Sequence, residues 1–106
     1  LAAEHAIAAA TLRRLKGEPL PALEDQNRAV AALDAAPDAT VMARGIAHAN
    51  LGTALLQAGK FAPAREQFER AIALWNSGGL SLNWNVLTTR TNLAHLALLQ
   101  GDERVA

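Results

Sequence analysis

The 106-residue chain has no cysteine, few aromatic residues and no excess charge of either sign. The absence of cysteine excludes a disulfide framework, a zinc site with cysteine ligands and a thiol nucleophile. Aromatic residues make up 4% of the chain, and β-branched residues are sparse, which argues against an all-β fold. Ten basic residues balance ten acidic ones, so we expect no direct binding of nucleic acid or of an anionic membrane surface. No apolar run approaches the ~20 residues that span a bilayer, and we expect a cytoplasmic protein.

Alanine and leucine dominate what is present. The 25 alanines and 17 leucines favour helix throughout, and apolar residues recur at helical spacing. Gly59 suits the end of one helix, and Pro63 suits the first turn of the next. Asp38 or Thr40 is the expected N-cap of a middle helix, and Ser81 that of a later one. We predict helices near residues 2–16, 21–35, 39–58, 61–76 and 82–100.

The sequence repeats itself, because Gly17, Gly59 and Gly101 are evenly spaced and define a 42-residue period. Pro21-Ala22 aligns with Pro63-Ala64, and Asn50-Leu51-Gly52 aligns with Asn92-Leu93-Ala94. We predict a single all-α domain over residues 1–106, with units of about 3–44, 45–86 and 87–106, each a pair of helices that needs its neighbours to form a core. Because the chain starts at Leu1, we expect it to be part of a longer protein, with a sixth helix beginning in its last residues.

The middle unit resembles a tetratricopeptide repeat (TPR). The motif positions are occupied by Leu51-Gly52, Leu55, Gly59, Phe61, Ala64, Phe68 and Ala71. His48 replaces an early tryptophan and Asn76 replaces a terminal proline. The 42-residue period is longer than the usual one of 34, as in kinesin light chain and many bacterial signalling proteins. In the first unit, Gln26 occupies a position where the motif prefers a larger apolar residue. The resemblance implies a right-handed α-solenoid of antiparallel helix pairs, about two and a half repeats long.

That resemblance also implies a function. A TPR module of a bacterial signalling or regulatory protein acts as a scaffold that binds a protein or peptide. The alanine- and leucine-rich composition is similar to the helical-repeat domain of MalT-type transcription regulators of bacteria, which implies an effector-sensing role as an alternative. A helical subdomain of an enzyme is the third hypothesis.

The TPR resemblance places a concave groove along the first helix of each unit. The implied groove residues are Ile7, Thr11, Arg14, Ile46, Asn50, Thr53, Gln57, Thr88, Asn92, His95 and Leu99. In related modules an asparagine at the position of Asn50 and Asn92 binds the backbone of an extended ligand. The sequence equally allows a structural role, in which both asparagine side chains cap a carbonyl or face water. Arg14 is the only cation in this set, so we expect an apolar or mixed peptide, or a small effector, and no strongly acidic ligand.

No constellation for catalysis or for a cofactor is present in the sequence. Neither GxxxxGK[ST] nor GxGxxG occurs, so no glycine-rich loop is available for phosphates. His5, His48 and His95 have no metal-ligand spacing, and we expect His48 to pack between helices. Ser77 and Ser81 have no histidine nearby in the sequence. We predict a protein that is not an enzyme and that binds no metal or cofactor.

Two apolar features of the chain concern its surface. Trp75 and Trp84 flank Gly78-Gly79, and either both close the core between units or one is exposed to a partner. The predicted helix 82–100 carries several leucines that need cover on more than one side. We expect self-association through this helix.

Overall fold

The computed structural model describes residues 19–101, and all of its regular structure there is α-helical. The four helices are α2 (Pro19–Ala35), α3 (Val41–Gln57), α4 (Phe61–Ser77) and α5 (Trp84–Leu99). The prediction of an all-α fold is therefore confirmed for residues 19–101. The predicted helix 2–16, the sixth helix and the residues Ile7, Thr11 and Arg14 lie outside the described residues.

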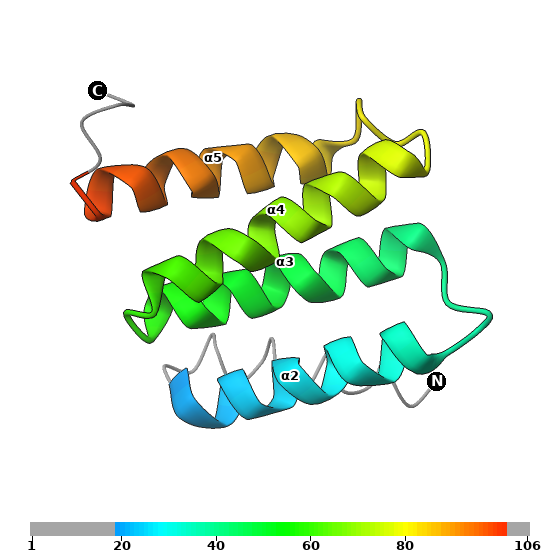
Figure 1. Ribbon diagram of the computed structural model, residues 1–106, viewed down its shortest axis with the longest axis horizontal. Helices are drawn as coiled ribbons and strands as arrows, with labels where there is room; N and C mark the ends of the chain where they lie inside the picture. Colours follow the sequence, from blue (N-terminus) through cyan, green and yellow to red (C-terminus); the bar gives the residue numbers. More distant parts are fainter. Residues whose placement is uncertain (1–18, 102–106) are drawn as a thin grey trace.

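Successive helices are antiparallel, and each lies beside the one before it (Figure 1). Helix α3 is central, since it packs against α2 on one side and α4 on the other, and it also contacts α5. Helix α5 lies along α4 at the far edge of the described region from α2 (Figure 1).

Local sequence explains where the helices end. Helices α3 and α4 are followed by Gly59 and Gly79, with φ of +76° and +75°. In both turns the residue after the glycine donates its backbone N–H to a carbonyl of the last helical turn, Lys60 to Leu55 O at 2.9 Å and Leu80 to Trp75 O at 2.7 Å. These bonds form Schellman motifs, which a residue with positive φ permits. The expectation that Gly59 ends a helix is confirmed.

The predicted N-cap is correct for α3 and wrong for α5. Thr40 caps α3, because its Oγ1 accepts a hydrogen bond from the N–H of Ala43 at 3.0 Å. The prediction for Ser81 is wrong, because Asn83 caps α5 and its Oδ1 accepts from the N–H of Asn85 at 2.7 Å. An additional turn, closed by the bond from Asn83 N to Leu80 O at 3.2 Å, precedes the helix and moves its start past Ser81.

The core has two parts, both between α3 and its neighbours. One part gathers Leu51, Leu55, Phe68 and Leu96, and the other gathers Ala71, Trp75 and Val86. Two glycines of α3 let α4 approach closely: a Cβ at Gly52 would lie 2.7 Å from the Phe68 ring, and one at Gly45 would lie 2.1 Å from Trp75 Nε1.

Burial separates the two tryptophans. Trp75 has no exposed surface, and its Nε1 donates to Met42 O at 3.4 Å. Trp84 is 77% exposed. The interpretation in which both tryptophans close the core is therefore wrong for Trp84, because most of this side chain lies outside the packing of the described helices.

Candidate functional site

Helices α3 and α5, with Trp75 of α4, line a partly open cavity of about 300 Å³ whose side chains are neutral. We call it the α3–α5 cavity. Its lining residues are Ile46, Ala49, Asn50, Thr53, Trp75, Asn85, Thr88, Thr89 and Asn92.

Helical spacing puts the polar residues on facing sides of the cavity. On α3, Ile46, Asn50 and Thr53 are separated by four and three residues, so they share one face. On α5, Asn85, Thr88 and Asn92 have the equivalent spacing. Asn50 and Asn92 are one repeat period apart in the sequence, and the structure brings both to this one cavity.

Several polar groups of the cavity have no partner in the described part of the chain. The side-chain amides of Asn50 and Asn92 make no hydrogen bond to residues 19–101, and both residues are only partly exposed. Because solvent reaches both amides, they can exchange bound water for the donors and acceptors of a ligand.

The other threonines of the cavity retain acceptor capacity. Thr53 and Thr88 donate their hydroxyl hydrogens to carbonyls four residues earlier, Ala49 O at 3.1 Å and Trp84 O at 3.2 Å. Their oxygen lone pairs are available to a donor. The lining residues include no charged side chain, so the cavity suits a neutral ligand with both donors and acceptors.

The predicted groove residues separate into two groups. Ile46, Asn50, Thr53, Thr88 and Asn92 line the cavity, whereas Gln57, His95 and Leu99 are exposed and do not line it. Gln57 and Leu99 are the last residues of their helices, and His95 lies one turn before the end of α5.

Sequence reasoning missed Ala49, Asn85, Thr89 and Trp75 as lining residues. Asn85 and Thr89 lie three residues before Thr88 and Asn92, so the same helical spacing would have found them. Trp75 comes from α4, and nothing in the sequence indicates that its ring forms part of this wall.

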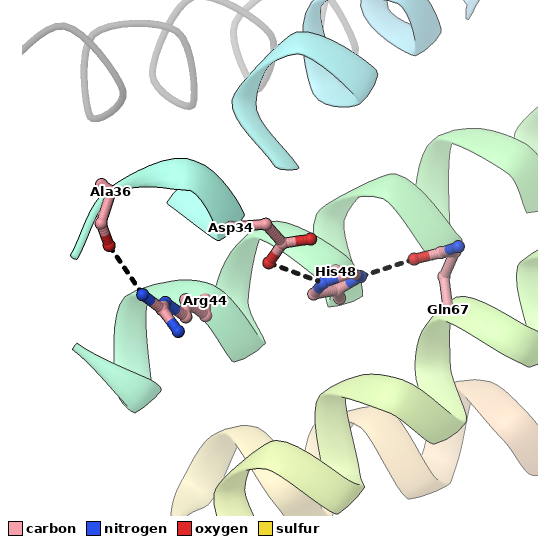
Figure 2. Close-up of polar contacts among 5 residues, drawn as sticks. All are labelled: Asp34, Ala36, Arg44, His48 and Gln67. Carbon is pink, nitrogen blue, oxygen red and sulfur yellow. Dashed lines mark hydrogen bonds and ion pairs between the residues drawn. The ribbon is translucent and has the colours of Figure 1, made fainter. Parts of the chain in front are cut away.

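A second polar cluster lies between α2, α3 and α4 (Figure 2). His48 is 4% exposed. Its Nδ1 lies 2.6 Å from Gln67 Oε1, and its Nε2 lies 3.4 Å from Asp34 Oδ1. The imidazole thus connects three helices, and the prediction that His48 packs between helices is confirmed.

Arg44 completes this cluster. Its Nη2 donates to Ala36 O at 2.6 Å, which ties the end of α2 to α3 (Figure 2). A hollow of about 490 Å³ lies beside these residues, and its wall includes Arg70 and Ser77. The Ser77 hydroxyl donates to Leu74 O at 2.8 Å, and His48 has a neighbour at each ring nitrogen. The geometry therefore does not pair Ser77 with His48 as nucleophile and base.

The acidic and histidine side chains of the described region form no metal site. Within 19–101, no group of three or more histidine, aspartate or glutamate side chains is arranged to hold a metal ion. Glu66 pairs with Arg70 at 3.1 Å on the exposed side of α4, one turn apart. No helix in this part of the chain is long and apolar enough to cross a membrane.

Comparisons with protein-family models, curated proteins and solved structures find no match to this chain. The function must therefore be argued from the structure alone, and the α3–α5 cavity with the side-chain amides of Asn50 and Asn92 is the feature best suited to bind a ligand.

Proposed function

We propose that the chain is a TPR-like interaction module that binds an extended, neutral segment of another protein in the α3–α5 cavity. The observation that carries this proposal is the pair of unbonded amides of Asn50 and Asn92, which open on one uncharged cavity. We assign the module a scaffold role within a bacterial signalling or regulatory protein.

Two turns of the chain support a repeated architecture. Gly59 and Gly101 both have positive φ, +76° and +67°, and both donate to the carbonyl three residues earlier, Leu56 O and Leu98 O, at 3.1 Å. The two turns are one repeat period apart, as expected for successive units of a solenoid.

The ligand class follows from side-chain chemistry. A carboxamide offers two N–H donors and one carbonyl acceptor without charge. A peptide group offers one donor and one acceptor, so two amides spaced along a groove can bind consecutive parts of an extended backbone. Ile46 and Ala49 provide apolar contact for a small side chain between them.

A small neutral effector is the second candidate, and the size of the cavity favours it. Its volume of about 300 Å³ lies at the lower end of the range for small-molecule sites, roughly 300–1,000 Å³. In this version the chain is the effector-sensing repeat domain of a transcription regulator, and occupancy of the cavity alters the contact between α3 and α5.

A peptide selection tests the first proposal. A displayed library of random peptides is selected on the wild-type chain, and the enriched peptides are titrated against an Asn50→Ala/Asn92→Ala variant. We expect affinity to fall about tenfold in the double variant, because each amide contributes about 0.5–1.5 kcal/mol through its hydrogen bonds. Asn76→Ala is the matched control, since Asn76 is exposed at the end of α4, outside the cavity.

The outcome separates the two candidates. Peptides that bind the control and wild type equally, and the double variant weakly, support the peptide-binding function. Equal binding to all three chains removes Asn50 and Asn92 from the site. Absence of any enriched peptide, together with stabilisation of the wild type but not the double variant by a neutral small molecule, supports the effector function.

A further inference from the structure

The hollow between α2, α3 and α4 contains an arginine whose charge is not balanced. Arg44 of α3 is partly buried, and its Nη2 donates to Ala36 O at 2.6 Å (Figure 2). No carboxylate of residues 19–101 forms an ion pair with it, and its buried Nε has no acceptor there. A guanidinium is stabilised away from bulk water by charge-assisted hydrogen bonds. Arg44 is therefore suited to an anion that the chain itself does not supply.

Arg70 of α4 brings a second guanidinium to the same hollow. Its Nη2 contacts Glu66 Oε1 at 3.1 Å, but the two side chains are 58% and 61% exposed. Exposed ion pairs of this kind contribute little to stability. Arg70 can therefore exchange this contact for one with a bound anion, and Glu66 does not line the hollow.

Asp34 limits the charge of an anion that the hollow can accept. It is the only acidic residue among those that line the hollow. Its Oδ1 lies 3.4 Å from His48 Nε2, and His48 Nδ1 faces Gln67, so the imidazole has no nitrogen left for a ligand. Two arginines and one aspartate leave one positive charge in the lining when His48 is neutral. The hollow therefore matches a singly charged carboxylate better than a doubly charged phosphate.

The rest of the wall is apolar and belongs to α4. Ala73 and Leu74 line the hollow beside Arg70. The Ser77 hydroxyl donates its hydrogen to Leu74 O at 2.8 Å, so it has no second hydrogen to offer an anion. The volume of about 490 Å³ lies within the range of small-molecule sites, roughly 300–1,000 Å³. A ligand with a carboxylate beside a short apolar group fits both parts of this wall.

We propose that this hollow binds a small monocarboxylate with an aliphatic body. The carboxylate lies at Arg44 and Arg70, whose planar guanidinium groups match its geometry. The aliphatic body lies on Ala73 and Leu74. No residue lines both this hollow and the α3–α5 cavity, so the inference does not depend on the proposed function.

Nitrogen-15 NMR of the arginine Nε–H groups tests the proposal on the full chain. The probe is 4-methylpentanoate, and its matched control is 4-methylpentanamide, which has the same shape without the charge. We expect the carboxylate to shift the Arg44 signal to saturation, with a dissociation constant on the order of 1 mM. The Arg44 signal is identified by its absence from Arg44→Lys. An equal response to the amide, or to sodium chloride at the same ionic strength, overturns the proposal.

Loss of an arginine locates the carboxylate. Arg70→Gln should weaken 4-methylpentanoate binding about tenfold, the effect of one lost charge-assisted hydrogen bond. Arg90→Gln is the matched control, because Arg90 is exposed on α5, does not line the hollow and carries the same charge. Equal weakening by both variants assigns the binding to the net charge of the chain and overturns the site.

Loss of the acidic residue gives a gain that a folding defect cannot imitate. Asp34→Asn should tighten 4-methylpentanoate binding roughly threefold, because it removes the carboxylate that repels the ligand. The new amide oxygen can still accept from His48. Asp38→Asn is the matched control, since Asp38 is exposed just after α2 and lies outside the hollow. Equal effects of the two substitutions overturn the location, and tighter binding of inorganic phosphate than of the carboxylate overturns the ligand class.

Discussion

Replacement of Gly45 by alanine is expected to destabilise the fold, although alanine is the better helix former. A Cβ at this position would lie 2.1, 2.4 and 2.8 Å from Nε1, Cε2 and Cδ1 of Trp75. Carbon atoms in favourable contact are ~3.5–4.0 Å apart. The indole cannot move aside freely, because Trp75 is fully buried and packs with Ala71 and Val86.

Three contributions decide the magnitude. Alanine in place of glycine favours the helix by about 1 kcal/mol. Overpacking of a filled core costs about 1–3 kcal/mol, and three overlapping ring atoms put this site at the upper end. Displacement of the ring also breaks the hydrogen bond from Trp75 Nε1 to Met42 O, which contributes about 1 kcal/mol. We expect a net loss of about 2–3 kcal/mol, and at about 4–8 °C per kcal/mol a fall in Tm of roughly 10–20 °C.

Urea unfolding followed by circular dichroism at 222 nm measures this loss. A second pair of variants isolates the contact: Trp75→Leu, and Gly45→Ala combined with Trp75→Leu. Without the indole, the new methyl group meets open space and partly refills it, so the double variant should be at least about 1 kcal/mol more stable than additivity predicts. Additive effects, or a Gly45→Ala chain as stable as wild type, would refute the close approach of α3 and α4.

Four further substitutions test separate parts of the structure by the same unfolding assay. Gln26→Leu should stabilise by about 1–3 kcal/mol, because Gln26 is fully buried and neither side-chain polar atom has a hydrogen-bond partner among the described residues; an unchanged or lower midpoint contradicts this. Gly59→Ala should cost about 1–2 kcal/mol through its positive φ alone, since no atom lies within 4 Å of the new Cβ. Thr40→Ala should cost about 1 kcal/mol through loss of the cap on α3, whereas Thr40→Ser should restore most of it. Ala64→Leu should cost about 1–3 kcal/mol, because Ala64 has no exposed surface, and a wild-type midpoint would place this residue away from the core.

Helix positions were predictable because the signals that set them are local. The predicted spans 39–58 and 61–76 correspond to Val41–Gln57 and Phe61–Ser77. Gly59 supplies a turn that requires positive φ, and Thr40 supplies a hydroxyl at the right place for an N-cap. The start of α5 was not predictable in the same way, because both Ser81 and Asn83 are good caps. The turn between Leu80 and Asn83 decides between them.

The candidate site was predictable along each helix but not across helices. The TPR resemblance implies a groove that includes Asn50, Asn92, Thr53 and Thr88, and helical spacing puts the residues of each helix on one face. Whether Gln57 or His95 joins them depends on the angle at which α3 and α5 cross, which no periodicity contains. The Trp75 wall depends in addition on the depth at which α4 packs into α3, set by the absence of a side chain at Gly45.

Gln26 shows how far position in the repeat determines environment. It lies one repeat period before Phe68, and both residues have no exposed surface. The sequence therefore indicated a core position, while the residue type indicated a polar one. The position in the repeat decides the environment, because the Gln26 amide is buried without a hydrogen-bond partner in the described region.

Helix α5 has a side that lines the α3–α5 cavity and a side that is open to solvent, and two substitutions distinguish them. Asn92 lines the cavity, whereas Leu98 is 68% exposed and does not line it. A substitution at Asn92 should therefore weaken ligand binding, and Leu98→Asp should leave it unchanged. Equal weakening by both substitutions would show that the loss of binding comes from a general effect on α5 and not from the Asn92 amide.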